Sequence, residues 1–362
     1  MFQALRTLRM LARAFLERVD RRLLPAAALG QTLSALYFML ANPRFRREQQ
    51  AVLAGRLAYE RRAAAVSDPL LRRNIHRLEK GLIMKPRQRV FARDYIGETV
   101  AAYERAERSD TADPTERRWA HDVLSQFFSV VEDAPEIARA RLQFASTLAF
   151  RESATFTESR EVDDHSSWAP FLRAEGTRAT VDYEAFIGLC RQRRSVRWFT
   201  TAAVPNELIE QAIAAAVQAP SACNRQPYFF RFFERHEDAS RIADIAMGTT
   251  GYAQQIPALI VVLGDLSCFP HERDRHLPYI DGALAAMQLM LALETLGLGS
   301  CPINWPDIEH LERRMAEELQ LPRWIRPIML LAVGYPDPLG GIAFSAKKPV
   351  PGLLRTDNTY PA

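Results

Sequence analysis

Apolar residues recur every three or four positions through most of the first 150 residues, with charged residues between them. This spacing is typical of amphipathic helices and predicts an all-helical N-terminal region over residues 1–150. Ser67-Asp68-Pro69 has the composition of a helix start, with an acidic cap and a proline in the first turn. Helices are predicted over residues 70–80, 94–107, 114–131 and 134–146.

The first 60 residues differ from the rest of this region. After an arginine-rich helical pattern, residues 23–41 form a run of 19 residues without a charge, bracketed by arginines. The run approaches the roughly 20 apolar residues that span a bilayer, but proline, glycine and polar residues dilute it. Three interpretations stay open: a helix that is buried or covered by a partner, an amphipathic helix at a membrane surface, or a true span.

A second pattern begins near residue 182, where helical segments alternate with short apolar runs. Residues 151–181 are polar and predict a linker to a second domain over residues 182–362. The predicted strands are 228–233, 257–263 and 327–333, and the predicted helices are 182–191, 205–218, 280–296 and 307–319. This order predicts an α+β sheet domain with one helix buried at its centre.

Charge divides the chain unevenly. The first 100 residues carry 20 Lys or Arg and 8 Asp or Glu, a net charge of +12, so the remainder carries −8 of the total of +4. The asymmetry indicates either an anionic partner for the N-terminal part or a solvated basic helix face. We expect no nucleic-acid partner.

The usual catalytic and metal-binding patterns are missing from the sequence. The four cysteines are far apart and form no CxxC pair, which favours a reducing, cytoplasmic environment and argues against a thiolate zinc site. There is no catalytic triad or paired-carboxylate signature. We therefore predict no metal ligand and no catalytic side chain.

Two short segments carry the most chemistry. Arg193-Arg194-Ser195 with Arg197 places three guanidinium groups and a hydroxyl within five residues. Arginine binds phosphate through a planar fork of charge-assisted hydrogen bonds. A second segment, Ala219 to Tyr228, contains Pro-Ser-Ala-Cys-Asn-Arg-Gln-Pro.

These segments, with Leu298 to Ile303, Gly334-Tyr335-Pro336 and a late lysine pair, resemble the nitroreductase family over residues 182–350. The resemblance implies an α+β fold with a mixed sheet flanked by helices. It further implies FMN as cofactor, NADH or NADPH as electron donor, and a homodimer with FMN at the interface. It also implies roles for particular residues. These residues are expected to contact four parts of FMN: the phosphate with the ribityl chain, the pyrimidine edge, the ring face and the region of flavin N5. In chain order they are Arg193, Arg194, Ser195, Arg197, Pro220, Ser221, Asn224, Pro302, Ile303, Asn304, Lys347 and Lys348.

The sequence departs from the family in three places. Asn304 and Trp305 replace the acidic residue and glycine that many members have after the Pro-Ile pair. Only residues 264–279 join the strand at 257–263 to the next helix, where larger members insert helices that form a lid. The long N-terminal helical region is extra, and we expect it to supply the lid. The basic segment 72–89 is either a second anion site or a salt-bridged surface between the domains.

The resulting prediction is an FMN-dependent oxidoreductase that transfers hydride from NAD(P)H through the flavin to a small organic acceptor of the nitroaromatic, quinone or enoate type. The alternative is a non-catalytic flavin-binding or sensing protein docked on a membrane or envelope-polymer assembly. Residues 1–60 would provide a peripheral contact with the inner face of the membrane.

Overall fold

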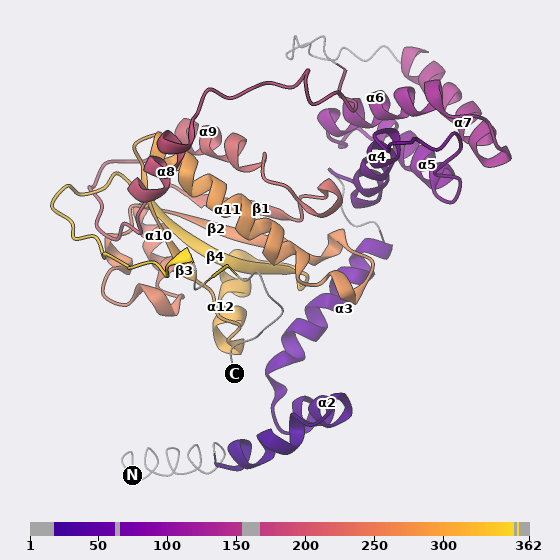
Figure 1. Ribbon diagram of the computed structural model, residues 1–362. Coiled ribbons are helices and arrows are strands. Elements are labelled where there is room, and N and C mark those ends of the chain that lie inside the picture. The colour runs from indigo at the N-terminus through magenta and orange to yellow at the C-terminus, as the bar shows by residue number, and fades with distance from the viewer. Residues whose placement is uncertain (1–17, 62–65, 154–166, 351–352, 355–362) are drawn as a thin grey trace.

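A computed structural model of the chain describes residues 18–61, 66–153, 167–350 and 353–354. Figure 1 shows an N-terminal helical arm, a cluster of helices, and a sheet with helices on both faces. The predicted fold class, an α+β domain preceded by a helical region, is confirmed. The predicted linker falls partly on residues 154–166, which lie outside the described residues.

Four antiparallel strands form the sheet, in the order β1-β2-β4-β3. β2 is central and buried along almost its whole length, as its continuous apolar sequence predicts. β3 was expected only as a segment that approaches the flavin, yet it pairs with β4 from end to end. The strands are β1 (Tyr228–Phe233), β2 (Ala258–Asp265), β3 (Gly299–Asn304) and β4 (Ile325–Gly334).

Helices cover both faces of this sheet. Alternate residues of β2 face opposite sides, so Leu259 and Val261 belong to one apolar core and Ile260 and Val262 to another. α10 (His236–Ala243) and α12 (Glu309–Leu319) complete the first core, and α9 (Asn206–Ala216) and α11 (Leu277–Thr295) complete the second. α8 (Tyr183–Gln192) packs against α11 and leads into the arginine segment.

A separate core holds the helical cluster, which comprises α4 (Pro69–Leu82), α5 (Ile96–Glu107), α6 (Pro114–Val130) and α7 (Pro135–Ser153). Large side chains such as Tyr103 and Phe127 are fully buried inside it. Two of the helices begin alike: the carboxylates of Asp68 and Asp113 accept backbone hydrogen bonds in the first turns of α4 and α6, and a proline follows each.

The uncharged run at 23–41 is not one helix. Residues 18–27 are helical, the chain turns at residues 28–30, and α2 (Gln31–Leu40) begins after Gly30. None of the helices in the described part of the chain is long and apolar enough to cross a membrane. After a short 3₁₀ turn, η1 (Pro43–Phe45), α3 (Arg46–Glu60) leaves the arm and packs against the sheet domain.

Candidate functional site

The arginine segment 193–197 is held in an extended form at the edge of the sheet. α8 ends at Gln192, and Ser195 then forms a parallel bridge with Ser300 of β3. The N–H of Val196 donates to the carbonyl oxygen of Ser300 at 3.0 Å. A Cβ on Gly299 would lie 2.9 Å from a methyl carbon of Val196, so the close approach requires glycine there.

Two arginines of this segment have different surroundings. The guanidinium of Arg194 donates to the carbonyl oxygen of Ala343 at 2.7 Å and to that of Phe344. This contact ties the C-terminal segment to the end of α8. In contrast, Nε of Arg193 is buried and has no hydrogen-bond partner among the described residues. Such a donor costs free energy unless a ligand satisfies it.

Arg197 lies near a buried pair of side chains. Its guanidinium carbon is 6.0 Å from the ring centre of Tyr252, whose hydroxyl oxygen is 4.0 Å from Sγ of Cys301. Burial raises the pKa of Tyr252 to about 12, and the neighbouring Cys301 adds to the shift. Burial also raises the pKa of the Cys301 thiol, although Arg197 and Arg193 oppose this shift. Both side chains are therefore protonated at neutral pH.

β3 presents its predicted site residues on alternate faces. Pro302 and Asn304 are exposed, whereas Ile303 is buried in the core. The side chain of Trp305, the departure from the family pattern, is buried and donates to a carboxylate oxygen of Glu312 at 2.6 Å. This tryptophan anchors the end of the strand to α12.

Loop 220–226 contains Pro220, Ser221 and Asn224 and has an unusual backbone. Cys223, Asn224 and Gln226 have φ angles of 54°, 52° and 49°, the left-handed region that non-glycine residues seldom enter. Local bonds support it: the N–H of Gln226 donates to Oγ of Ser221 at 3.1 Å, and that of Ala222 to the Asp281 carboxylate at 2.9 Å.

The structure brings together only part of the predicted site. Segment 193–197 lies beside β3 and is tied to the C-terminal segment that continues to the exposed Lys347 and Lys348. Loop 220–226 instead contacts α4, on the far side of the sheet domain from α8 (Figure 1). Within the described ranges, no hydrogen bond or ion pair joins the loop to segment 193–197.

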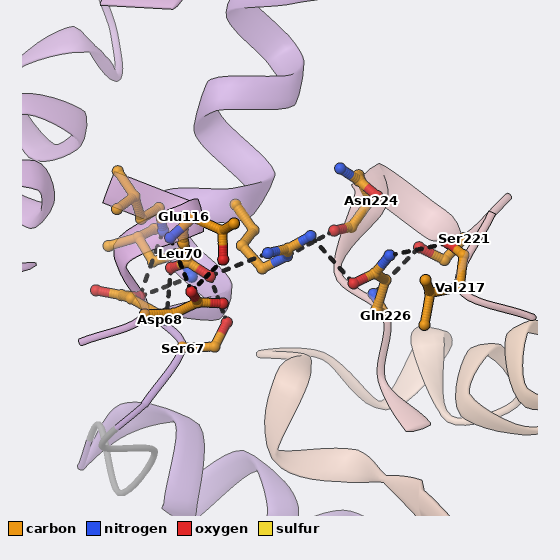
Figure 2. Close-up of polar contacts among 12 residues, drawn as sticks. Ser67, Asp68, Leu70, Glu116, Val217, Ser221, Asn224 and Gln226 are labelled. Atoms are coloured by element: carbon orange, nitrogen blue, oxygen red, sulfur yellow. Dashed lines mark hydrogen bonds and ion pairs between the residues drawn. The ribbon is translucent and has the colours of Figure 1, made fainter. Parts of the chain in front are cut away.

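Sequence reasoning did not single out Arg72. Its side chain donates from α4 to loop 220–226, with Nε 2.8 Å from the carbonyl oxygen of Asn224 and one terminal nitrogen 3.3 Å from Oε1 of Gln226 (Figure 2). In the sequence, only its place in the dense basic segment 72–89 pointed to a role for Arg72. Arg73 and Arg77 of that segment instead meet Glu98 and the ring of Tyr95 inside the helical cluster.

One cavity among the described residues does not coincide with the predicted cofactor residues. It measures about 710 Å³ and lies between the end of α3, the helices α4 to α6, and the turn after β2. Its charged side chains largely pair with one another, such as Arg73 with Glu98 and Arg105 with Asp68. We therefore assign no ligand to it.

The model of the nitroreductase family matches residues 190–255 and 251–335. A protein of Archaeoglobus fulgidus, named as a candidate NADH dehydrogenase/NAD(P)H nitroreductase, is 30% identical over 149 residues, which cover 40% of this chain and 81% of that protein. An FMN reductase [NAD(P)H] of Bacillus subtilis is 29% identical over 171 residues, with coverage of 43% and 66%. A solved nitroreductase family protein from Streptococcus pneumoniae is 25% identical, with coverage of 48% and 100% and a TM-score of 0.41.

The chain belongs to the nitroreductase family. The matched residues contain the arginine segment, loop 220–226 and all four strands. The family predicted from the motifs over residues 182–350 is confirmed. The helical cluster and the arm precede the matched region.

Proposed function

We propose that the chain is an FMN-dependent oxidoreductase that passes electrons from NADH or NADPH to a small organic acceptor of the nitroaromatic, quinone or enoate type. Membership in the family, with relatives named as FMN reductases and NAD(P)H nitroreductases, supports the enzyme class, the cofactor and the donor. The observation that carries the proposal in this chain is the arginine segment fixed beside β3, with the buried Nε of Arg193 left unpaired.

The residues present fit FMN. Besides Nε of Arg193, the Oγ atom of Ser300 on the paired strand is buried without a hydrogen-bond partner in the described part of the chain. Two unsatisfied polar groups on adjacent strands favour a polar ligand there. We assign Arg193, Ser195 and the Lys347–Lys348 pair to the phosphate and ribityl chain, and Arg197 to the pyrimidine edge.

When bound, FMN supplies the hydride-transfer chemistry, and the protein binds and orients it. A cation at the position of Arg197 stabilises negative charge on a neighbouring ring, so this side chain would favour a reduced, anionic cofactor. The exposed face of Pro302 and Asn304 leaves room for the ring beside β3. Arg194, whose donors already hold the C-terminal segment, would position that segment and contribute less directly to the phosphate.

A homodimer completes the site in this proposal. Loop 220–226 and segment 193–197 lie on different sides of one chain, and a two-fold related copy could bring the loop of one chain to the arginines of the other. α11 offers a surface for this contact because Ile280, Leu284 and Met287 lie on one helix face and are 52%, 45% and 41% exposed.

The decisive measurement is the absorbance spectrum of the purified full-length protein, followed by anaerobic addition of NADH and NADPH. We expect flavin bands that either donor bleaches. The variant Arg193→Ala should weaken FMN binding by about ten- to hundredfold, because a charge-assisted contact is lost. Arg191→Ala, which changes an exposed arginine two residues earlier, is the matched control. Bound FMN that neither donor reduces would instead favour the non-catalytic flavin-binding or sensing protein.

We also propose that the N-terminal arm contacts an anionic membrane surface, at the inner face of a cytoplasmic membrane. On α2, Leu33, Leu36, Met39 and Leu40 are 47%, 44%, 56% and 74% exposed, and arginines flank the helix on both sides. Exposed apolar residues next to cations are typical of interfacial helices. The full-length protein should sediment with phosphatidylglycerol vesicles and less with phosphatidylcholine vesicles. Equal recovery with both, or with neither, would refute the anionic surface.

A further inference from the structure

Arg72 joins the helical cluster to loop 220–226. It lies in the first turn of α4, where its backbone N–H donates to the carbonyl oxygen of the capping residue Asp68 at 3.0 Å. The side chain is 13% exposed. Proline and the aspartate cap fix the direction of this first turn, so the side chain leaves the helix at a defined position.

A buried carboxylate orients the guanidinium. One terminal nitrogen of Arg72 lies 3.0 Å from Oε2 of Glu116, whose side chain is only 4% exposed. The same carboxylate accepts hydrogen bonds from Oγ of Ser67 at 2.6 Å and from the N–H of Asp68 at 2.9 Å. The ring of Trp119 lies 5.3 Å from the guanidinium carbon. Both carboxylate oxygens of Glu116 therefore have partners. Figure 2 shows Glu116 on one side of this network and the loop residues Asn224 and Gln226 on the other.

The remaining donors of Arg72 meet the part of the loop that local sequence favours least. Nε donates to the carbonyl oxygen of Asn224, a left-handed residue, and Nη2 donates to Oε1 of Gln226, another left-handed residue. A left-handed conformation is unfavourable for a non-glycine residue, because its Cβ approaches the following carbonyl oxygen. Such a backbone persists when surrounding contacts determine it. Arg72 provides two of these contacts, from more than 150 residues away in the sequence.

We propose that Arg72 is a positioning residue that holds loop 220–226 in its FMN-binding shape and so makes cofactor binding depend on the docked helical cluster. The proposal rests on the flavoenzyme function proposed above. Without this contact the loop samples other conformations. The apparent affinity for FMN is then the intrinsic affinity multiplied by the fraction of molecules that keep the binding shape. Arg72 does not itself take part in hydride transfer.

The test compares Arg72→Ala with Arg73→Ala in the full-length protein. Arg73 is the adjacent residue on α4 and pairs with Glu98 inside the cluster. Among the described residues it forms no hydrogen bond with the loop, and its charge only opposes that of Arg225. After removal of the flavin, FMN is titrated back and its fluorescence is followed, and the visible circular dichroism of the bound flavin is recorded. We expect Arg72→Ala to raise the dissociation constant of FMN by roughly ten- to hundredfold and to change the dichroism at saturating FMN, and Arg73→Ala to change neither.

Arg72→Lys resolves the case in which Arg72→Ala does not fold. Lysine keeps a cation beside Glu116 but lacks the fork that reaches two loop acceptors at once. It should preserve the fold and still weaken FMN binding. Parent-like affinity and dichroism in a folded Arg72 variant, or equal losses in Arg72→Ala and Arg73→Ala, would overturn the positioning role. A parent protein that binds no FMN would overturn the flavoenzyme proposal itself, and the positioning role with it.

Discussion

Replacing Gly55 with alanine should separate α3 from the sheet domain. Gly55 packs against the 3₁₀ turn η5 (Leu266–Cys268), which follows β2. A Cβ at residue 55 would lie 2.7 Å from Cβ of Leu266, 2.8 Å from its carbonyl carbon and 2.8 Å from its carbonyl oxygen. Two of these atoms belong to the backbone, so no change of side-chain rotamer relieves the contact. The helix or the turn has to move.

The expected loss of stability depends on how closely α3 packs against the sheet domain at Gly55. Ala51 and Ala58 lie on the same face of α3 and are 2% and 5% exposed, so the helix approaches the domain through small residues. Overpacking at such a site costs about 1–3 kcal/mol. Alanine in a helix interior recovers about 0.5–1 kcal/mol relative to glycine. The exposed ion pairs Arg47–Glu309 and Arg56–Glu272 beside the contact each contribute little. Subtracting the gain from the cost leaves an expected net loss of up to about 2.5 kcal/mol.

Urea unfolding followed by circular dichroism measures this loss, and limited trypsin digestion reports whether α3 detaches locally. Gly97→Ala is the matched control, since nothing lies within 4 Å of a Cβ at that position of α5. The control should gain up to about 1 kcal/mol from helix propensity alone. The same substitution should therefore have opposite effects at the two sites. Equal stabilisation of both variants would refute the packing of α3 against η5.

Three further outcomes are expected. Arg197→Gln should lower the two-electron potential of the flavin while much of the FMN stays bound, and dye-coupled redox titration checks this. The folded protein holds the Tyr252 proton with a pKa of about 12, against 10.0 for the free side chain, so stability should fall between pH 10 and pH 12. Thermal melting of Tyr252→Phe should show a shallower decline. Deletion of residues 1–42 keeps α3 and should leave the flavin spectrum intact. Deletion of residues 1–60 removes α3, which packs against the sheet domain, and should lower the melting temperature.

Local sequence signals predicted most of the elements. The capping pattern at Ser67-Asp68-Pro69 predicted a helix over residues 70–80, and α4 covers Pro69–Leu82. The predicted strand 228–233 has the same bounds as β1. α10 was missed because it has only eight residues, three of them charged. β3 was not predicted as a strand because it contains glycine and proline, and its conformation depends on pairing with β4.

Contacts between distant segments could not be predicted in the same way. The basic segment 72–89 was chosen for its charge, but charge does not say which arginine faces outward. Arg73 and Arg77 are four residues apart and share a face of α4 that meets α5, whereas Arg72 is rotated by about 100° from Arg73 and meets α6 and loop 220–226. The helix pattern fixes this relative rotation, but only tertiary packing decides which face meets the sheet domain.

The two contacts of the N-terminal helices constrain each other. α3 packs on η5, which belongs to the short 264–279 connection, and α4 contacts loop 220–226. These sheet-domain segments are themselves linked, because the N–H of Asp265 donates to the carbonyl oxygen of Pro227 at 2.9 Å. A shift of α3 at Gly55 therefore strains the region that carries Asn224 and Gln226. If Gly55→Ala weakens FMN binding as well as stability, and Gly97→Ala does not, then the helices act on the loop as a connected unit. Loss of stability with unchanged FMN affinity would mean that Arg72 alone carries the coupling.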